Sequence, residues 1–322
     1  MEVALSLNNK QQSLKKVLTN INKVIIGKDE TITLSLTALL AQGHVLLEDI
    51  PGVGKTMLVR ALAKSLNCSF NRIQFTPDLL PSDITGVSIY HPRTQQFEYK
   101  QGPIVGDIVL ADEINRTSPK TQSALLEAME ENSVTVDGET IRIDPPFFVM
   151  ATQNPIEYEG TYSLPEAQID RFLLKLSMGY PTEQEEVEML ERVGGIHPIE
   201  RISAIINRQD VIDMQSDVND VYVDSIIQQY IVKIIRATRE HPHIQLGVSP
   251  RGAIGLMRAA KAYAYIQNRD YCLPDDVIYL APFVLTHRLI LTQEAQYERR
   301  STEQIIQSIL NQIDVPTRKV RT

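Results

Sequence analysis

The sequence predicts an α/β domain, in which helices cover both faces of a parallel sheet, followed by an all-helical second domain. Short apolar runs without polar alternation recur in the first half of the chain, as in strands buried on both faces. Helical patterns separate these runs, and strand patterns stop after about Tyr180. A length of 322 residues also suits two domains better than one core.

Two helices are expected before the first strand. The first ends near Gly27 and has apolar residues at helical spacing, namely Leu14, Val17, Leu18 and Ile21. The second begins near Asp29, and Gly43 supplies its stop. The apolar face of the first helix requires a packing partner.

Four short runs are expected to form strands of the sheet, at residues 44–47, 71–75, 108–111 and 147–151. A helix follows the first run after a glycine-rich turn, because apolar residues fall four apart at Leu58, Leu62 and Leu66. Another helix begins at Ser118–Pro119, with serine as N-cap and proline at the first helical position.

Two β-hairpins are expected as insertions on this core. The first joins residues 87–90 to 97–100 through a His-Pro-Arg-Thr turn. The second joins residues 134–136 to 141–143 through Asp-Gly, a strong turn dipeptide between alternating segments.

Helices are expected throughout the rest of the chain. Their starts are marked by a capping-box pattern at Thr182 and Glu185, by Asp224, by Ser249–Pro250 and by Leu273–Pro274, and a last helix covers residues 303–313. We therefore divide the chain into a nucleotide-binding α/β domain at 1–180, a linker with connecting helices at 181–222, and a helical lid at 223–322.

Composition excludes several classes of protein. Hydrophobic residues make up 43% and charged residues 22%, and no apolar run approaches the length of a membrane span. The amino terminus lacks a secretory-signal pattern, so a cytoplasmic protein is expected. Cys68 and Cys272 are far apart and predict two reduced thiols. The net charge of -8 and dispersed Lys and Arg make nucleic acid an unlikely partner.

A phosphate-binding loop is indicated between the first strand and its helix. Gly52 and Gly54 allow backbone N–H groups to wrap a phosphate, Lys55 can reach the β- and γ-phosphates, and the Thr56 hydroxyl can bind magnesium. The stretch matches GxxxxGK[ST] except at Asp49, whose carboxylate we expect to point away from the phosphates, toward N–H groups of its own turn.

Further candidate groups follow later strands. Asp112 and Glu113 end the 108–111 run, where a nucleotide hydrolase keeps a magnesium carboxylate and the acid that polarises water. Asn154 follows the 147–151 run and could hold that water, although Asn154–Pro155 is also a common turn. Arg171 is a further candidate, although it could also form an ordinary surface ion pair. Arg251 lies in the first turn of a helix, which costs it about 0.3 to 1 kcal/mol unless an anion is near.

These motifs, in this order, resemble the MoxR family of AAA+ ATPases. The similarity covers almost the whole chain and rests on four stretches: "EDIPGVGKT", "ADEINRTSPKTQSALLEAMEE", "ATQNPIEYEGTYSLPEAQIDRF" and "SPRGAIGLMRAAKAYA". The resemblance implies an AAA+ core with two hairpin insertions and a helical lid. Aspartate is ordinary at the position of Asp49 in that family.

The resemblance also implies a role for each candidate residue. Lys55 and Thr56 would be the Walker A pair, Asp112 and Glu113 the Walker B pair, Asn154 sensor 1, Arg171 the arginine finger, and Arg251 sensor 2. The nucleotide would contact Ile26, Gly27, Pro51, Gly52, Val53, Gly54, Lys55, Thr56, Met57, Asp112 and Arg251, and magnesium would bind Thr56 and Asp112.

The function implied is hydrolysis of Mg-ATP between subunits of a hexameric ring that remodels or matures client proteins, including metal insertion, with a partner bearing a von Willebrand factor A domain. Three alternatives stay open at this point. The chain could be a slowly hydrolysing, nucleotide-gated binding module or a DNA-stimulated motor. It could also be a GTPase, although the guanine-reading Asn-Lys-x-Asp pattern is absent.

Overall fold

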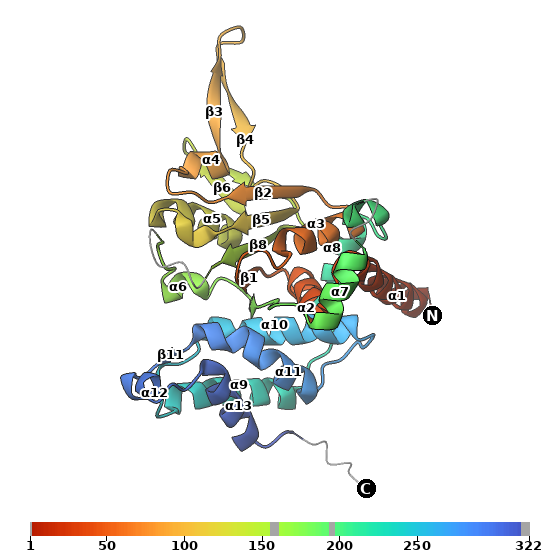
Figure 1. The fold of residues 1–322 in the computed structure, drawn as a ribbon, viewed down its shortest axis with the longest axis vertical. Coiled ribbons are helices and arrows are strands. Elements are labelled where there is room, and N and C mark those ends of the chain that lie inside the picture. The colour runs from red at the N-terminus through yellow and green to blue at the C-terminus, as the bar shows by residue number, and fades with distance from the viewer. Residues whose placement is uncertain (1, 155–160, 193–196, 317–322) are drawn as a thin grey trace.

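A five-stranded parallel sheet forms the centre of the first domain in the computed structural model, which describes residues 2–154, 161–192 and 197–316 (Figure 1). Its strand order is β2-β5-β8-β1-β9. The bounds are β1 Val45–Glu48, β2 Phe70–Gln74, β5 Ile108–Asp112, β8 Phe148–Gln153 and β9 Leu174–Leu176. The four expected strands are confirmed, whereas the three residues of β9 are too short to give a recognisable pattern.

The strands are apolar throughout because both faces of the sheet are covered. Val45 and Leu47 of β1 face the cluster formed with the helices α1, α2 and α3, while Leu46 faces the cluster formed with α5. These helices are α1 Glu2–Asn22, α2 Asp29–Leu40, α3 Lys55–Ser65 and α5 Pro119–Glu131. The Ser118 hydroxyl accepts a hydrogen bond from the Thr121 N–H, as expected of the N-cap of α5.

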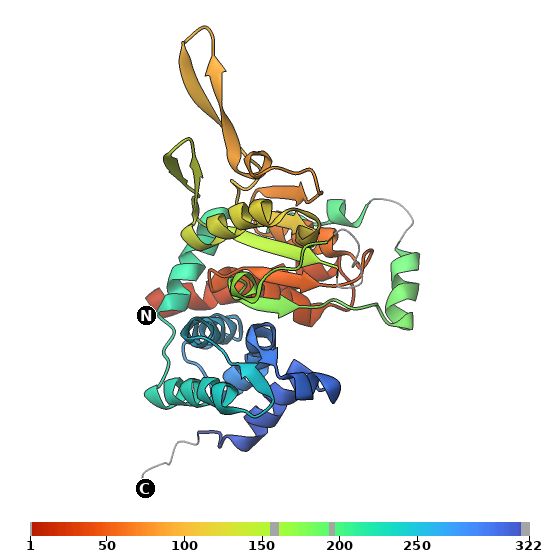
Figure 2. The same cartoon turned by 90° about the vertical axis from the view of Figure 1, so that its left-hand side faces the viewer.

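Two antiparallel hairpins leave this core on the side of β2 (Figures 1 and 2). The longer pairs β3 Gly86–His91 with β4 Gln96–Gln101, and the shorter pairs β6 Ser133–Val136 with β7 Glu139–Arg142. Tyr90 and Phe97 lie 5.4 Å apart, between ring centroids, on the long hairpin, where Phe97 is 73% exposed. Both insertions are therefore confirmed.

The remaining short elements lie within the core, between the core and the second domain, and after α11. They are α4 Pro81–Thr85, α6 Glu166–Ile169, α7 Glu183–Glu191 and α8 Arg208–Asn219, with 3-10 turns at η1 Ile114–Arg116, η2 Pro198–Arg201 and η3 Thr286–Arg288. The capping box of Thr182 and Glu185 is present at the start of α7. The helix α8 packs against both α2 and α10, so the connection does not run freely between the domains.

The second domain packs against the β9 edge of the sheet, with α10 against α2 and α11 against β9 (Figure 1). Its helices are α9 Ser225–Glu240, α10 Pro250–Ile266, α11 Pro274–Leu285, α12 Gln293–Tyr297 and α13 Thr302–Gln312. The domain is not entirely helical, because β10 Ile244–Leu246 pairs with β11 Ile290–Leu291. Segments of three and two residues carry no periodicity, which explains why this ladder was not predicted. Within the described residues, no helix is long and apolar enough to cross a membrane.

Candidate functional site

The phosphate-binding loop lies at the carboxyl end of β1 and leads directly into α3. Gly52 and Gly54 have φ angles of 87° and 93°, a left-handed backbone that glycine adopts without steric cost. A Cβ added at either glycine would meet no atom within 4 Å. The first turn of α3 has no side-chain cap and no acidic residue. The loop therefore presents backbone N–H groups and open space at a helix N-terminus, which fits a phosphate group.

Asp49 connects the loop to residues 177–179, which follow β9, through hydrogen bonds. Its carboxylate accepts hydrogen bonds from the Ser177 hydroxyl at 3.1 Å, from the Met178 N–H, and from the Gly179 N–H at 3.1 Å. The expectation that its partners would be N–H groups of its own turn was wrong. The residue is buried, and segment 177–179 supplies the donors that its carboxylate requires.

Lys55 begins α3, and its ammonium donates to the Asp49 carbonyl at 2.8 Å. Burial lowers the pKa of Lys55, while the nearby charges of Asp49, Asp112 and Glu113 act in the opposite direction. The three carboxylates thus favour the charged ammonium that would pair with a phosphate.

Asp112 ends β5, beside the end of β8. Its Oδ1 accepts from the Thr152 hydroxyl at 2.7 Å, and its Oδ2 forms an ion pair with Arg72 Nη2 at 2.6 Å. The Thr152 hydroxyl also accepts from the Glu113 N–H at 2.8 Å. A single threonine on β8 therefore contacts the Asp112 carboxylate and the Glu113 backbone, a role that the sequence alone did not assign to it.

Glu113 follows β5 in a left-handed conformation, with φ 60° and ψ 50°. Non-glycine residues in this region store strain of about 1 to 3 kcal/mol, and such residues cluster at functional sites. The side chain contacts Gln74 Nε2 at 2.8 Å and Arg116 Nε at 3.4 Å, both from Oε2. The carboxylate is thus held at the carboxyl edge, the side of the sheet at which the parallel strands end, where the ends of β2 and β5 are paired.

Asn154 follows β8 on the same edge and is buried. Its carbonyl accepts from Asn115 Nδ2 at 3.3 Å. Residues 155–160, including Pro155 of the expected turn and part of the third family-like stretch, lie outside the described residues. The carboxyl edge therefore brings together Lys55, Thr56, Asp112, Glu113 and Asn154 from the ends of three adjacent strands.

The turn at Ile26 and Gly27 contacts the segment that follows β9. That segment is in turn bound to the phosphate-binding loop. Lys28 Nζ donates to the Tyr180 carbonyl at 3.1 Å. A Cβ on Gly27 would lie 1.6 Å from Oε1 of Glu185, so α7 touches this turn directly. Because Asp49 binds residues 177–179, this segment joins the loop to the turn that is expected to contact the nucleotide.

Arg171 and Arg251 lie at the amino edge, the side of the sheet at which the parallel strands begin. Arg171 shortly precedes β9, and Arg251 belongs to the first turn of α10. Strands rise about 3.3 Å per residue, so the amino and carboxyl edges are roughly 15 Å apart. The structure therefore does not bring these arginines to the loop of their own chain.

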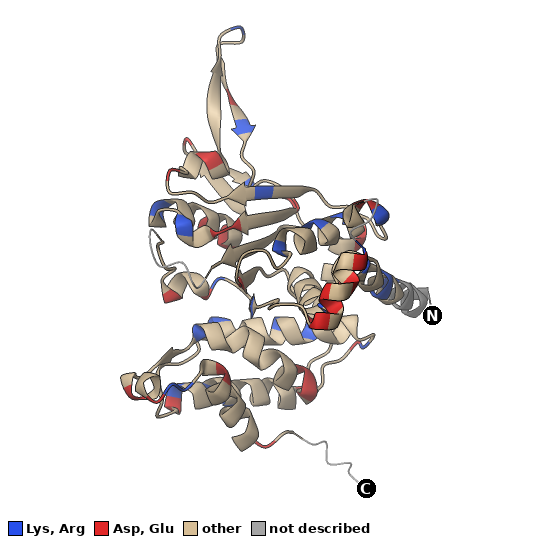
Figure 3. Ribbon diagram, in the orientation of Figure 1, with Lys and Arg blue, Asp and Glu red and all other residues tan. Residues whose placement is uncertain are grey.

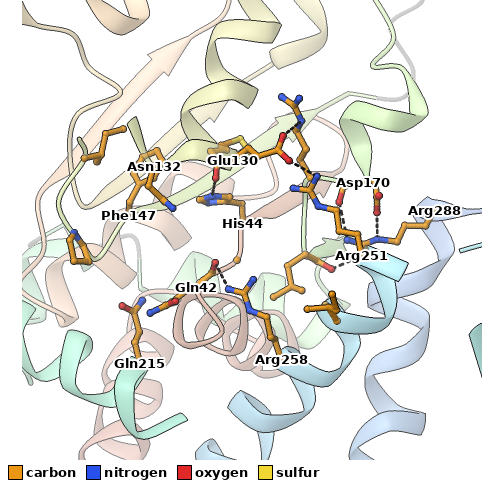
Figure 4. Close-up of a pocket in the computed structure, with 18 residues that line it drawn as sticks. Gln42, His44, Glu130, Asn132, Phe147, Asp170, Gln215, Arg251, Arg258 and Arg288 are labelled. Carbon is orange, nitrogen blue, oxygen red and sulfur yellow. Dashed lines mark hydrogen bonds and ion pairs between the residues drawn. The ribbon is translucent and has the colours of Figure 1, made fainter. Parts of the chain in front are cut away.

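Both arginines line a cavity of about 730 Å³ between the core and the second domain (Figure 4). The Glu130 carboxylate contacts Arg171 Nε at 2.9 Å and Arg251 Nη1 at 2.9 Å. Glu130 supplies the anion that offsets the helix dipole at Arg251, so the position of that arginine alone does not demand a phosphate.

His44 immediately precedes β1, lines the same cavity and is buried. Its Nδ1 accepts from the Val149 N–H at 3.0 Å, which leaves Nε2 to donate to the Met129 carbonyl at 3.0 Å. Burial lowers the pKa of His44 to about 4. The ring is therefore a neutral structural link between the sheet and α5.

Charge elsewhere is dispersed. Figure 3 shows Lys and Arg interspersed with Asp and Glu over both domains, with acids concentrated on α7. Cys68 and Cys272 are free thiols whose pKa values burial raises to about 12. The described residues contain no cluster of three His, Cys, Asp or Glu side chains suited to a metal ion.

Residues 44–174 match the family model described as "ATPase family associated with various cellular activities (AAA)", and residues 236–309 match the "AAA lid domain" model. The Bacillus subtilis protein YeaC is 61% identical over 95% of this chain and 96% of its own length. Chaperone MoxR1 of Mycobacterium tuberculosis is 41% identical over 94% of this chain and 82% of its own.

A crystal structure from Cytophaga hutchinsonii is also similar, with a TM-score of 0.92 and 41% identity over 98% of each chain. The two family models appear in the order of the α/β domain and the helical domain. The chain therefore belongs to the MoxR family of AAA+ ATPases.

Proposed function

We propose that the protein hydrolyses ATP between copies of itself and uses this reaction to remodel client proteins. The observation that carries the proposal is the separation of the two candidate groups onto opposite edges of one sheet. The loop and acids lie at the carboxyl edge, and Arg171 and Arg251 lie at the amino edge. One chain therefore supplies two halves of different sites, and a neighbouring copy is needed to complete each.

ATP would bind along the loop and the start of α3. The contacting residues would be Pro51, Gly52, Val53, Gly54, Lys55, Thr56 and Met57, with Ile26 and Gly27 beside the base. The positive φ angles and the uncapped helix N-terminus support phosphate binding here. We also propose the division into domains at residues 180 and 222, with 181–222 as a linker with connecting helices.

Thr56 and Asp112 would hold the magnesium ion. Magnesium is usually bound by one or two carboxylates together with substrate phosphates, which suits a site with few acidic ligands. When bound, the ion would neutralise charge on the phosphate oxygens. The Thr152 hydroxyl orients Asp112 for this role.

Glu113 and Asn154 would align and polarise the attacking water. Gln74 Nε2 donates to the Glu113 carboxylate, so this contact has to loosen before the acid can turn toward a water molecule. Arg171 and Arg251 would reach the γ-phosphate held by the neighbouring copy. Arginines supplied in trans raise rates by roughly 10³ to 10⁵ in other phosphoryl-transfer systems.

The assembly would be a hexameric ring in the cytoplasm, with a von Willebrand factor A domain protein as partner. The name of Chaperone MoxR1 supports a chaperone-like action on clients, including complex assembly or metal insertion. Retention of Glu113 and Arg171 argues against a slow nucleotide-gated binding module. Dispersed charge argues against a DNA-stimulated motor, because phosphate-backbone binding requires clustered Lys and Arg.

The test is the ATPase rate per subunit as a function of protein concentration. We expect the rate to rise with concentration until assembly is complete, because isolated subunits lack the trans arginines. A rate per subunit that stays constant from the monomeric to the assembled range would contradict hydrolysis between copies.

A further inference from the structure

Glu130 occupies the last turn of α5 and contacts two arginines that come from different domains; Figure 4 shows it beside Arg251. One carboxylate oxygen lies 2.9 Å from Nε of Arg171 in the core, and the other lies 2.9 Å from Nη1 of Arg251 in α10. Each oxygen has its own guanidinium partner. The two like charges are thus held on one carboxylate across the boundary between domains.

These contacts contribute little to stability. The side chains are 35%, 27% and 44% exposed for Glu130, Arg171 and Arg251, and ion pairs at such exposure contribute about 0 to 1 kcal/mol. Their effect is instead one of orientation, because two guanidinium groups this close would otherwise repel each other and separate.

The other two arginines that line the cavity do not contact Glu130 and are held by Asp170 and by backbone carbonyls. Arg288 is buried, pairs with Asp170 Oδ1 at 2.6 Å and donates to the Phe172 carbonyl at 2.7 Å. Arg258 donates to the Gln42 carbonyl at 2.8 Å. Arg288 therefore fixes the backbone on either side of Arg171, and Glu130 contacts the side chain of Arg171.

We propose that Glu130 is a positioning residue that presents Arg171 and Arg251 as a pair to the nucleotide of the neighbouring copy. This proposal rests on the proposed function. Glu130 does not touch the substrate and acts only through the arginines. Because Arg251 belongs to the lid, the same carboxylate also fixes how the lid contributes to the neighbouring site.

The first test is Glu130→Gln, which keeps the size of the side chain and removes its charge. We expect kcat of the assembled protein to fall roughly 10- to 100-fold, since misplacing a catalytic group by about 1 Å can cost about 100-fold. KM for ATP should change less than kcat, because the loop that holds the phosphates is untouched. Glu131→Gln, the same change one residue further along α5, should match the wild type. An unchanged or increased kcat in Glu130→Gln would overturn the proposal.

The second test mixes Glu130→Gln with Lys55→Ala. Activity should recover in the mixture, because the intact loop of one variant meets the intact arginine pair of the other. A mixture of Arg171→Ala with Lys55→Ala is made in parallel. If only the Arg171→Ala mixture recovers, the role of Glu130 is refuted while hydrolysis between copies stands. If neither mixture recovers, the proposed function fails, and the role of Glu130 fails with it.

Discussion

The two edges of the same sheet are built in different ways. At the carboxyl edge, Asp112 ends a strand, and Lys55 and Asn154 follow a strand within seven residues or fewer, so the strand itself places the side chain. At the amino edge, Glu130 and Arg171 come from separate core segments and Arg251 from another domain. The groups at the carboxyl edge are thus placed by local sequence, whereas the pair of arginines at the amino edge is complete only when the lid is docked.

The difference has a functional consequence. Each edge carries groups that would act on a triphosphate, yet roughly 15 Å of sheet separates them within one chain. Changes at the carboxyl edge should affect the chain's own nucleotide, and changes at the amino edge should affect the nucleotide of its neighbour.

The largest effect is expected for Arg171→Ala. The assembled protein should lose roughly 10³- to 10⁵-fold in kcat, because the charge supplied in trans is removed. ATP affinity of the separated subunits, measured with a fluorescent analogue, should stay at the wild-type value. The control is Arg236→Ala on α9, which removes another ion-paired arginine. Loss of ATP affinity in separated Arg171→Ala subunits would contradict the claim that Arg171 acts only on the nucleotide of the neighbouring copy.

Glu113→Gln should reduce kcat by roughly 10² to 10⁴, the range for loss of a group that transfers a proton. Binding of ATP should persist, because Lys55 and the loop are untouched, and the variant should remain trapped with ATP in the assembly. Isothermal titration and steady-state rates measure the two quantities separately. A Glu113→Gln protein with wild-type turnover would remove the acid from its proposed role.

Asp49→Gly would restore the general loop pattern while removing the carboxylate from its three donors. We expect the free energy of unfolding to fall by about 2 kcal/mol, because buried N–H groups lose their acceptor. The apparent Tm should fall by several degrees. Asp49→Asn retains one acceptor oxygen and should lose less. An Asp49→Gly protein as stable as the wild type would mean that the contact with segment 177–179 does not hold the loop.

The effect that is smallest at neutral pH concerns His44. Its pKa is lowered to about 4 by burial, so the unfolded chain, with a usual value of 6.5, takes up the proton first. Stability should be constant above pH 6.5 and fall as pH decreases toward 4, by up to about 3 kcal/mol from this group. His44→Gln should flatten this slope, although it starts from lower stability. The same slope in both proteins would exclude His44 as its cause.

Most of the fold could be predicted because its signals are local. The apolar runs, the turn dipeptide at Gly138 and the caps at Ser118 and Asp224 each report on a few neighbouring residues, and the corresponding elements are present. The strand β9 and the β10–β11 ladder were missed because two or three residues have no period. Their pairing depends on where distant segments meet.

The candidate site divides in the same way. The loop and the two acids were found from sequence because their spacing within a motif is fixed. Thr152, Gln74 and Glu130 were missed, since a lone polar residue at a strand or helix end has many ordinary explanations. The partners of Asp49 were wrongly assigned because segment 177–179 lies more than 120 residues away in the chain.

The most direct test of the account is ATPase activity across mixtures of Lys55→Ala and Arg171→Ala subunits at constant total concentration. Each variant alone should be nearly inactive. Hydrolysis between copies predicts a maximum near equal proportions, where an intact loop most often meets an intact arginine. Activity that stays at the level of the separate variants at every ratio would contradict the claim that the two edges meet between copies.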